Sequence, residues 1–142
     1  SLEEHSRDFQ YDIICSNPPF FKTTFTSKDK ETSLAKHQES LSYINVIEFA
    51  NKQLTKKGSV NLIIPFDSAE DCKRIALNND LHLTKECIIY PKKNIKASRS
   101  LLEFSKEKSI LKKEELIIEN DNRHDYTTDY KKLTRDFYTI FS

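Results

Sequence analysis

The hydrophobic pattern begins with one strand-like run and one long helix-like stripe. Residues 11–15, Tyr-Asp-Ile-Ile-Cys, predict a short and largely buried strand. Pro18 and Pro19 end it, because proline cannot donate a hydrogen bond to a neighbouring strand. Residues 22–33 are polar without periodicity, which indicates a surface loop. Apolar residues at three- and four-residue steps then predict a helix over about 34–57, with Leu41, Ile44, Ile47, Ala50 and Leu54 on its buried stripe.

The only glycine of the chain stands where this helix is expected to end. Lys56 and Lys57 suit the negative end of a helix, and Gly58 suits its cap. The apolar run 59–65 follows immediately and predicts a second strand. The start of the chain is therefore expected to alternate strand, helix and strand.

One further helix and a series of strands complete the pattern. Asp67 or Ser68 can cap a helix over about 68–78. Its expected inward positions are Ala69, Cys72, Ile75 and Ala76. The later predicted elements are strands over 81–90, 99–107 and 115–119, and a helix over about 128–141 with Tyr130, Leu133, Phe137 and Phe141 on one face.

This order of elements predicts a mixed α/β sheet. Alternation at the start implies parallel strands joined by right-handed crossovers, and the later strand-to-strand run implies an antiparallel edge. With 142 residues, the chain is long enough for one domain with a core. It contains no apolar run near the roughly 18 residues of a membrane helix and no signal-peptide pattern, so we expect a cytoplasmic protein without a membrane partner.

Composition narrows the chemistry further. The net charge of +1 does not point to nucleic acid, so any RNA affinity must come from a local patch. Cys15, Cys72 and Cys87 are odd in number and form no CxxC pair, which favours reduced core cysteines over disulfides or a metal site. A single glycine excludes a glycine-rich phosphate or dinucleotide loop within these residues. The absence of methionine predicts a chain that begins downstream of its own initiator.

The segment "SNPPF", residues 16–20, carries the most specific chemistry. It follows a strand, and ligands of open α/β sheets bind beyond the carboxyl ends of strands. Pro18 and Pro19 fix the backbone, Asn17 offers an amide oxygen as an acceptor, and Phe20 offers a flat face. A planar group bearing an NH₂ fits these features together. Two acceptors that bend its N–H bonds out of plane would direct the nitrogen lone pair towards a methyl donor, by orientation and electrostatics alone.

Several segments together resemble a known enzyme family. "NPPF" is similar to the Asn/Asp/Ser-Pro-Pro-aromatic signature of AdoMet-dependent amino-methyltransferases. "YDIICSNPPFF", "AKHQESLSY", "GSVNLIIPF" and "DYTTDYKKLTRDFY" resemble the C-terminal half of the bacterial tRNA (adenine-N6)-methyltransferases. The resemblance covers essentially the whole chain, 1–142. It implies half of a Rossmann-like class I methyltransferase domain, whose glycine-rich AdoMet-binding half is absent.

The resemblance also implies roles for individual residues. Asn17, Pro18, Pro19 and Phe20 would be catalytic, with Asn17 and the Pro18 carbonyl accepting hydrogens of an adenosine N6 amine in a tRNA anticodon loop. Ser16 and Asn17 would contact S-adenosyl-L-methionine (AdoMet), most of whose site is expected outside this chain. The residues proposed to contact tRNA are Lys22, Lys36, His37, Lys92, Lys93 and Arg99. No metal is implied.

Alternatives remain open at this point. The same signature serves methylation of a protein glutamine at N5 and of DNA adenine at N6, and composition does not separate the three. A proline-rigidified loop without chemistry is the simplest interpretation of the tetrapeptide, and scattered lysines most often only solvate a surface. A folded fragment without catalysis, self-associating over an exposed sheet edge, is the alternative of another class.

Overall fold

The computed structural model describes residues 9–18 and 43–135. The predicted loop 22–33, the beginning of the long helix with Leu41, and the last residues with Phe137 and Phe141 lie outside the described residues.

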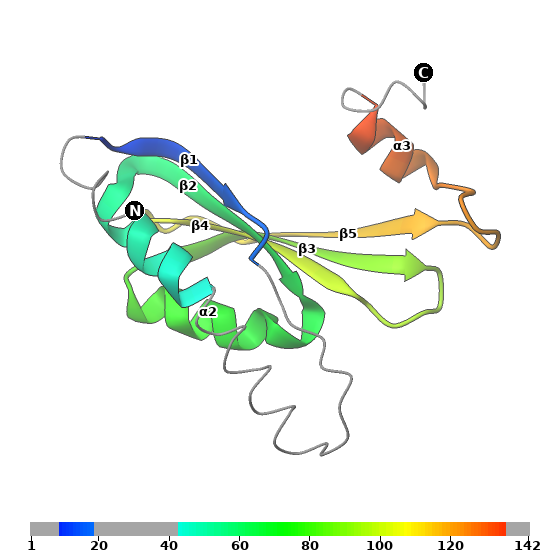
Figure 1. Cartoon of the computed structure of the whole chain (residues 1–142), viewed down its shortest axis with the longest axis horizontal. Helices are drawn as coiled ribbons and strands as arrows, with labels where there is room; N and C mark the ends of the chain where they lie inside the picture. Colours follow the sequence, from blue (N-terminus) through cyan, green and yellow to red (C-terminus); the bar gives the residue numbers. More distant parts are fainter. Residues whose placement is uncertain (1–8, 19–42, 136–142) are drawn as a thin grey trace, which may run out of the picture.

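A five-stranded mixed sheet forms the centre of the described structure (Figure 1). Its strands are β1 (Tyr11–Ser16), β2 (Leu54–Pro65), β3 (His82–Lys92), β4 (Arg99–Ser105) and β5 (Lys112–Glu119), in the order β1-β2-β4-β3-β5. β1 is parallel to β2 and β3 is parallel to β5, whereas β4 is antiparallel to both of its neighbours. The mixed α/β class is confirmed.

The position of the antiparallel strand corrects the sequence prediction. We expected it at an edge, but β4 lies inside the sheet, between β2 and β3. Phe104 of β4 is paired with Val60 on one side and with Leu83 on the other. β4 therefore satisfies its backbone groups on both sides, and the edge beyond β3 is taken by the parallel strand β5.

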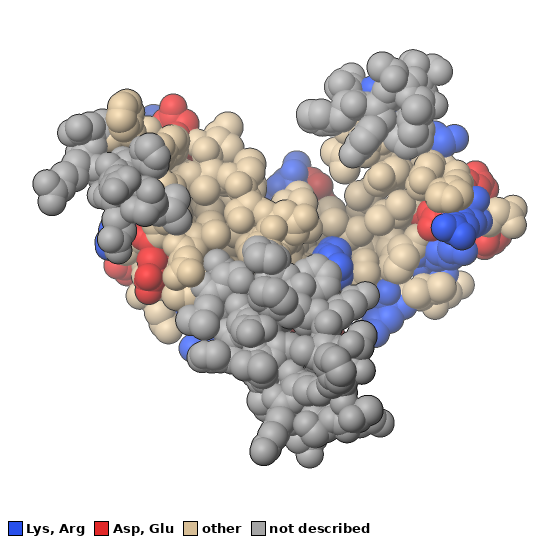
Figure 2. All heavy atoms as spheres, in the orientation of Figure 1, with Lys and Arg blue, Asp and Glu red and all other residues tan. Residues whose placement is uncertain are grey.

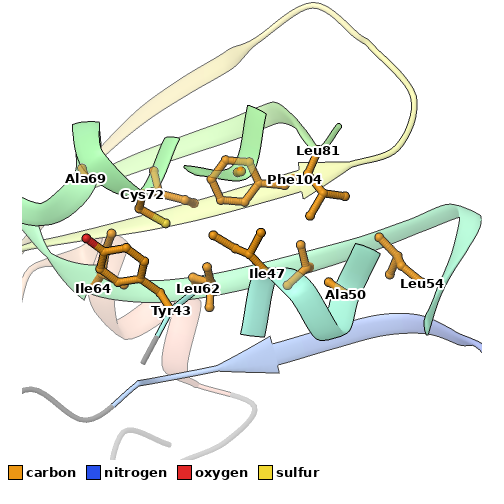
Figure 3. Packing of buried hydrophobic residues seen from close by; sticks show 13 residues of the cluster. Tyr43, Ile47, Ala50, Leu54, Leu62, Ile64, Ala69, Cys72, Leu81 and Phe104 are labelled. Carbon is orange, nitrogen blue, oxygen red and sulfur yellow. The ribbon is translucent and has the colours of Figure 1, made fainter. Parts of the chain in front are cut away.

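Two helical segments pack on one face of the sheet, over β2, β4 and part of β3, and they enclose the core (Figure 3). They are the helical residues 43–53 and α2 (Ala69–Asn78), the latter preceded by the short 3-10 turn η1 (Phe66–Ser68). Ile47 and Ala50 from the first helix and Cys72 and Ala76 from α2 are fully buried, as predicted. Val60, Leu62 and Ile64 of β2 and Leu102 and Phe104 of β4 complete the same cluster from the sheet.

Side-chain contacts fix these two helices to each other. The Tyr43 hydroxyl donates a hydrogen bond to the Asp71 carboxylate of α2, and the same carboxylate pairs with Arg74. Ser68 is the N-cap residue of α2, but its side chain makes no capping hydrogen bond, and Asp67 lies in η1 instead. Glu70 and Asp71 in the first turn of α2 supply the negative charge that favours a helix start.

The predicted end of the long helix is wrong. The helical residues end at 53, and β2 already begins at Leu54. Leu54 pairs with Tyr11 and Ser59 with Ile13, so the intervening residues bulge out of the parallel ladder. Pairing with β1 thus overrides the helical pattern, and Lys56, Lys57 and Gly58 belong to β2 rather than to a helix terminus.

β1 is more exposed than predicted. Ile13 keeps 67% and Tyr11 39% of its surface accessible, and the free Cys15 is exposed rather than a core residue. β1 lies at the edge of the sheet, and only Ile14 packs against the core cluster. The apolar sequence therefore indicated a strand correctly, but not its burial.

The other two cysteines are buried and free, as predicted. Burial raises the pKa of the Cys72 thiol to about 12 and also raises the pKa of Cys87. Thiols with raised pKa values are poor nucleophiles and poor metal ligands, so these two are structural residues.

The last described helix, α3 (Thr128–Thr134), packs on β5. Thr127 caps it by accepting a hydrogen bond from the Tyr130 backbone nitrogen, and the Thr127 hydroxyl itself donates to the Ile117 carbonyl. Leu133 is 61% exposed. Of the helices within residues 9–18 and 43–135, none combines the length and apolarity needed to cross a membrane.

Candidate functional site

The predicted catalytic segment lies at the carboxyl end of β1. Ser16 is half-buried and is the last paired residue of the strand, opposite Leu62. Asn17 follows it with an exposed side chain, whereas Pro18 is buried. β2 continues for three residues beyond Leu62, so this edge of the sheet forms a step beside Asn17. A buried proline thus anchors an exposed amide at the edge where open α/β sheets bind ligands.

Arg99 lies on the same edge of the sheet. It opens β4 and is paired with Pro65 on one side and with Ile89 on the other. Its Nη1 donates to the Ser98 carbonyl at 2.9 Å, and the same carbonyl accepts from the Phe66 backbone nitrogen at 3.1 Å. The start of β4 and the end of β2 are thereby held together. Arg99 lies two strand spacings to the side of Asn17 and two residues further along, about 12 Å away in an ideal sheet.

Lys92 and Lys93 also reach this edge, but farther from Asn17. Lys92 is the last residue of β3, and its Nζ lies 3.5 Å from the Asp121 carbonyl oxygen. Lys93 is exposed at the start of the turn to β4, followed by Asn94 with a left-handed φ of 63°. The strand order places both lysines three strands from β1, on the opposite half of the sheet.

The remaining predicted site residues lie outside the described residues. They are Pro19, Phe20, Lys22, Lys36 and His37. The catalytic role of Pro19, the base-stacking role of Phe20 and the RNA contacts of Lys22, Lys36 and His37 therefore stay predictions. Among residues 9–18 and 43–135, no group of His, Cys, Asp and Glu is arranged to hold a metal ion.

Sequence reasoning missed three residues that the structure brings to the carboxyl edge. Phe66 follows β2 directly and is half-buried beside the start of β4. Tyr90 of β3 and Glu115 of β5 line one pocket together with Lys92 and Lys93. Two of them could have been noticed in the sequence. Phe66 directly follows "IIP" and Tyr90 directly precedes "PKK", so each is an aromatic residue at the end of a predicted strand, as Phe20 is.

Basic residues collect on the β3–β5 half of the molecule. Figure 2 shows Lys and Arg side chains along this side, with acidic groups towards its outer end. On α3, a depression of about 330 Å³ is lined by Thr128 and by three basic residues, Lys131, Lys132 and Arg135. Although its net charge is only +1, the chain therefore carries a local cationic surface. Such a local patch is what RNA binding by a near-neutral chain requires.

The comparisons with known proteins agree with this arrangement. No family model matches the chain. It is 32% identical over 133 residues to a Bacteroides fragilis protein named tRNA1(Val) (adenine(37)-N6)-methyltransferase. The aligned residues make up 94% of this chain and 56% of that protein. A Flavobacterium johnsoniae protein of the same name is 40% identical over 134 residues, covering 91% of this chain and 55% of that protein. The resemblance stated from the sequence is confirmed, and the chain spans little more than half the length of these curated relatives.

A solved structure supports the fold. A protein from Agrobacterium tumefaciens, described as a predicted O-methyltransferase, superposes with a TM-score of 0.66 at 17% identity, covering 94% of this chain and 55% of that one. Identity at this level carries information about the fold alone. The described sheet and helices are thus part of a Rossmann-like methyltransferase fold.

Proposed function

We propose that this chain forms the target-amine half of an AdoMet-dependent methyltransferase acting on the N6 amine of an adenosine in a tRNA anticodon loop. One observation carries the proposal. Asn17 is exposed on a buried Pro18 at the carboxyl end of β1, in a chain 32–40% identical to proteins named tRNA1(Val) (adenine(37)-N6)-methyltransferase. The chain spans little more than half the length of those relatives, and we propose that it corresponds to their C-terminal half.

The residues at the end of β1 orient the amine. The Asn17 side-chain oxygen and the Pro18 carbonyl each accept one N6 hydrogen, which concentrates the nitrogen lone pair on the opposite side. Because Pro18 is buried and its φ is fixed by its ring, little entropy is lost when the amine binds. After transfer, the methylated nitrogen releases one proton to solvent. Phe20 is proposed to stack on the adenine, in a loop whose bases are already partly unstacked.

The described residues fit only one wall of an AdoMet site. AdoMet, when bound, would supply the methyl group from its sulfonium sulfur, and the sulfur would leave as a neutral thioether. Ser16 and Asn17 are proposed to contact it at the end of β1. The only glycine, Gly58, is buried in β2 against the Asp12 carbonyl, so it cannot form a cofactor loop. We therefore propose that the greater part of the AdoMet site lies outside residues 1–142.

Basic residues on the same edge are proposed to hold the RNA backbone. Arg99 lies nearest to Asn17 among those described, and Lys92 and Lys93 extend the cationic surface across the sheet. Lys22, Lys36 and His37 lie outside the described residues and are proposed contacts from the sequence alone. Such contacts weaken with rising salt, because each phosphate that a cation neutralises releases counterions. A tRNA substrate also implies a cytoplasmic protein.

The test is methyl transfer from labelled AdoMet to unmodified bulk tRNA, using the natural gene product that contains this chain. We expect label in N6-methyladenosine. Asn17→Ala should lower kcat/KM by about 10²-fold or more, the size seen when one preorganised hydrogen-bond partner is removed from a reacting group. Asn17→Asp is the matched control, because it keeps an acceptor oxygen at the same place, and it should retain more activity than Asn17→Ala.

Other outcomes separate the alternatives. Label on a protein glutamine or on DNA, lost in Asn17→Ala, would keep the amine chemistry and replace the substrate. If Asn17→Ala leaves methyl transfer intact, residues 17–20 are a rigid loop without a catalytic role. For residues 1–142 alone, micromolar AdoMet binding would contradict the non-catalytic fragment, while no binding at millimolar AdoMet would support it.

A further inference from the structure

A pocket of about 300 Å³ lies on the β3–β5 half of the sheet, at its carboxyl edge. Its floor is formed by two neighbouring strands, because Tyr90 of β3 is paired with Ile117 of β5. Its rim is the turn from β3 to β4, with Lys93 and Asn94. α2 packs on β4 and β3 and is paired with Glu86 of β3, and Figure 1 shows β3 and β5 extending past this helix.

The side chains around this pocket form a combination suited to a nucleotide. Tyr90 is half-buried in the sheet and offers an aromatic ring. Glu115 of the neighbouring strand is exposed and offers a carboxylate that can accept base N–H groups. Lys92 and Lys93 supply positive charge at the rim. The volume falls at the lower end of the range for small-ligand pockets, which suits one base rather than a larger ligand.

The two rim lysines remain available to a ligand. Lys93 is exposed and its side chain makes no hydrogen bond or ion pair within the described residues, and the contact of Lys92 with the Asp121 carbonyl is long, at 3.5 Å. Lys96, farther along the same turn, is instead paired with Asp67 of η1 at 3.7 Å. The turn is also held in place, because the Ser98 backbone nitrogen donates to the Ile89 carbonyl at 2.9 Å.

We propose that this pocket binds a second, unpaired nucleotide of the tRNA, separate from the adenosine that is methylated. The base stacks on Tyr90, the Glu115 carboxylate accepts N–H groups from its edge, and Lys92 and Lys93 contact the flanking phosphates. Recognition of unpaired bases by stacking and edge hydrogen bonds is the usual mode of sequence-specific RNA binding. The inference rests on the proposed tRNA substrate and adds a specificity site to it.

The distance from the catalytic segment is compatible with one RNA loop. Ser16 is level with Glu86 through the pairs Ser16–Leu62, Leu62–Leu102 and Leu102–Glu86. Tyr90 therefore lies three strand spacings to the side of Asn17 and three residues further along, about 17 Å away in an ideal sheet. This is roughly half of one turn of a nucleic-acid duplex, about 34 Å, so a single folded anticodon arm can reach both places.

The experiment measures binding and methylation of an unmodified anticodon stem-loop by the natural gene product that contains this chain. Tyr90→Leu should weaken binding about tenfold and raise KM while kcat changes less than about twofold, because base–aromatic stacking contributes to binding but not to the reaction. Tyr90→Phe keeps the ring and should bind like wild type. Lys93→Ala should weaken binding and reduce its salt dependence. Lys108→Ala, at an exposed lysine in the connection from β4 to β5, is the matched control for charge and should have little effect.

A series of stem-loops, each with one abasic nucleotide in the loop, makes the test specific. At one position other than the target adenosine, the abasic substitution should weaken wild-type binding and leave Tyr90→Leu unaffected. Glu115→Gln should change the preferred base at that position only. A Tyr90→Leu effect that persists with every abasic RNA, or no effect at all, would overturn the inference while leaving the proposed function intact. Wild-type protein that neither binds nor methylates tRNA would overturn both.

Discussion

Gly58 lies in β2 at a point where the backbone of β1 comes unusually close. A Cβ atom built on it would lie 2.8 Å from the Asp12 carbonyl oxygen and 2.8 Å from Leu54 Cδ1. No left-handed φ accounts for the glycine, since no glycine in the described residues has a positive φ. Its role is therefore to admit the neighbouring backbone and not to end a helix.

Gly58→Ala is expected to destabilise the fold by about 1–3 kcal/mol, the usual cost of overpacking a buried position. The Asp12 oxygen belongs to the backbone of β1, so it cannot move aside without disturbing the strand that carries Asn17. Urea unfolding measures the change. Lys57→Ala, at the preceding and exposed position, is the control and should stay within about 0.5 kcal/mol.

A second substitution at the same residue distinguishes the two roles. Asparagine is tolerated at a left-handed helix cap, so a capping Gly58 would accept Gly58→Asn with little loss. If Gly58 instead makes room for the β1 backbone, Gly58→Asn should destabilise the fold at least as much as Gly58→Ala. Equal stability of all three proteins would show that β1 relaxes around the added atoms.

The same residues show what single positions reveal in advance. Asn17 and Pro18 could be placed at a strand end from the sequence, because a proline pair after an apolar run stops a ladder wherever the run lies in the sheet. The role of Gly58 could not, since it depends on which strand passes beside it. Tyr90 and Glu115 were missed for the same reason, because they meet only through the pairing of β3 with β5.

α2 is joined to β3 by an ion pair at the rim of the core. Lys73 Nζ lies 2.6 Å from the Glu86 carboxylate and 2.8 Å from Glu70. The Glu86 side chain is only 6% accessible, whereas that of Glu70 is 88% accessible. The pair with Glu86 is thus the one that matters for stability, because exposed pairs contribute little.

Lys73→Met is expected to cost about 3 kcal/mol, because it leaves the buried Glu86 carboxylate without its cation. The double variant Lys73→Met/Glu86→Leu should recover most of this loss, since it removes both charges together. Chemical unfolding of the four proteins of the cycle gives the coupling energy. Equal losses in the single and double variants would place the energy of this contact in packing instead of charge.

The pH dependence of this contact has a defined sign. Burial alone would lower the pKa of Lys73, but hydrogen bonds to Glu70 and Glu86 and the Glu86 charge outweigh it and raise the pKa above its ordinary value of 10.5. The native state thus holds this proton more tightly than the unfolded state does. The stabilisation is complete below pH 10.5 and is lost as pH rises through the native pKa. The double variant should lack this part of the alkaline loss.

Elements were predictable where their signal is local. Residues 69–78 combine an inward stripe with acidic residues in the first turn, and α2 begins and ends within a residue or two of the expected range. The helix expected over 34–57 instead gives way at Leu54, because pairing with Tyr11 competes with the helical stripe there. The insertion of β4 between β2 and β3 is likewise a property of long-range pairing, which local periodicity does not contain.

At the scale of the whole molecule, the described sheet has an unpaired outer edge at β1. Within residues 9–18 and 43–135, β1 pairs only with β2, and Ile13 on it is 67% exposed. Tyr11 and Ile63 nearby are 39% and 38% exposed. An apolar edge strand with free backbone groups is a template for pairing with another chain. Self-association through this edge thus stays a prediction for residues 1–142 on their own.

Sedimentation velocity of residues 1–142 over a range of concentrations tests it. We expect concentration-dependent association that Ile13→Lys shifts towards monomer, because a charge on an edge strand opposes pairing with a second strand. Ile110→Lys is the matched control, since Ile110 is 96% exposed in the connection from β4 to β5, away from β1. If only Ile110→Lys gives monomers, the protein associates through the connection from β4 to β5. If the wild-type chain is monomeric at every concentration, the β1 edge does not pair with a second chain.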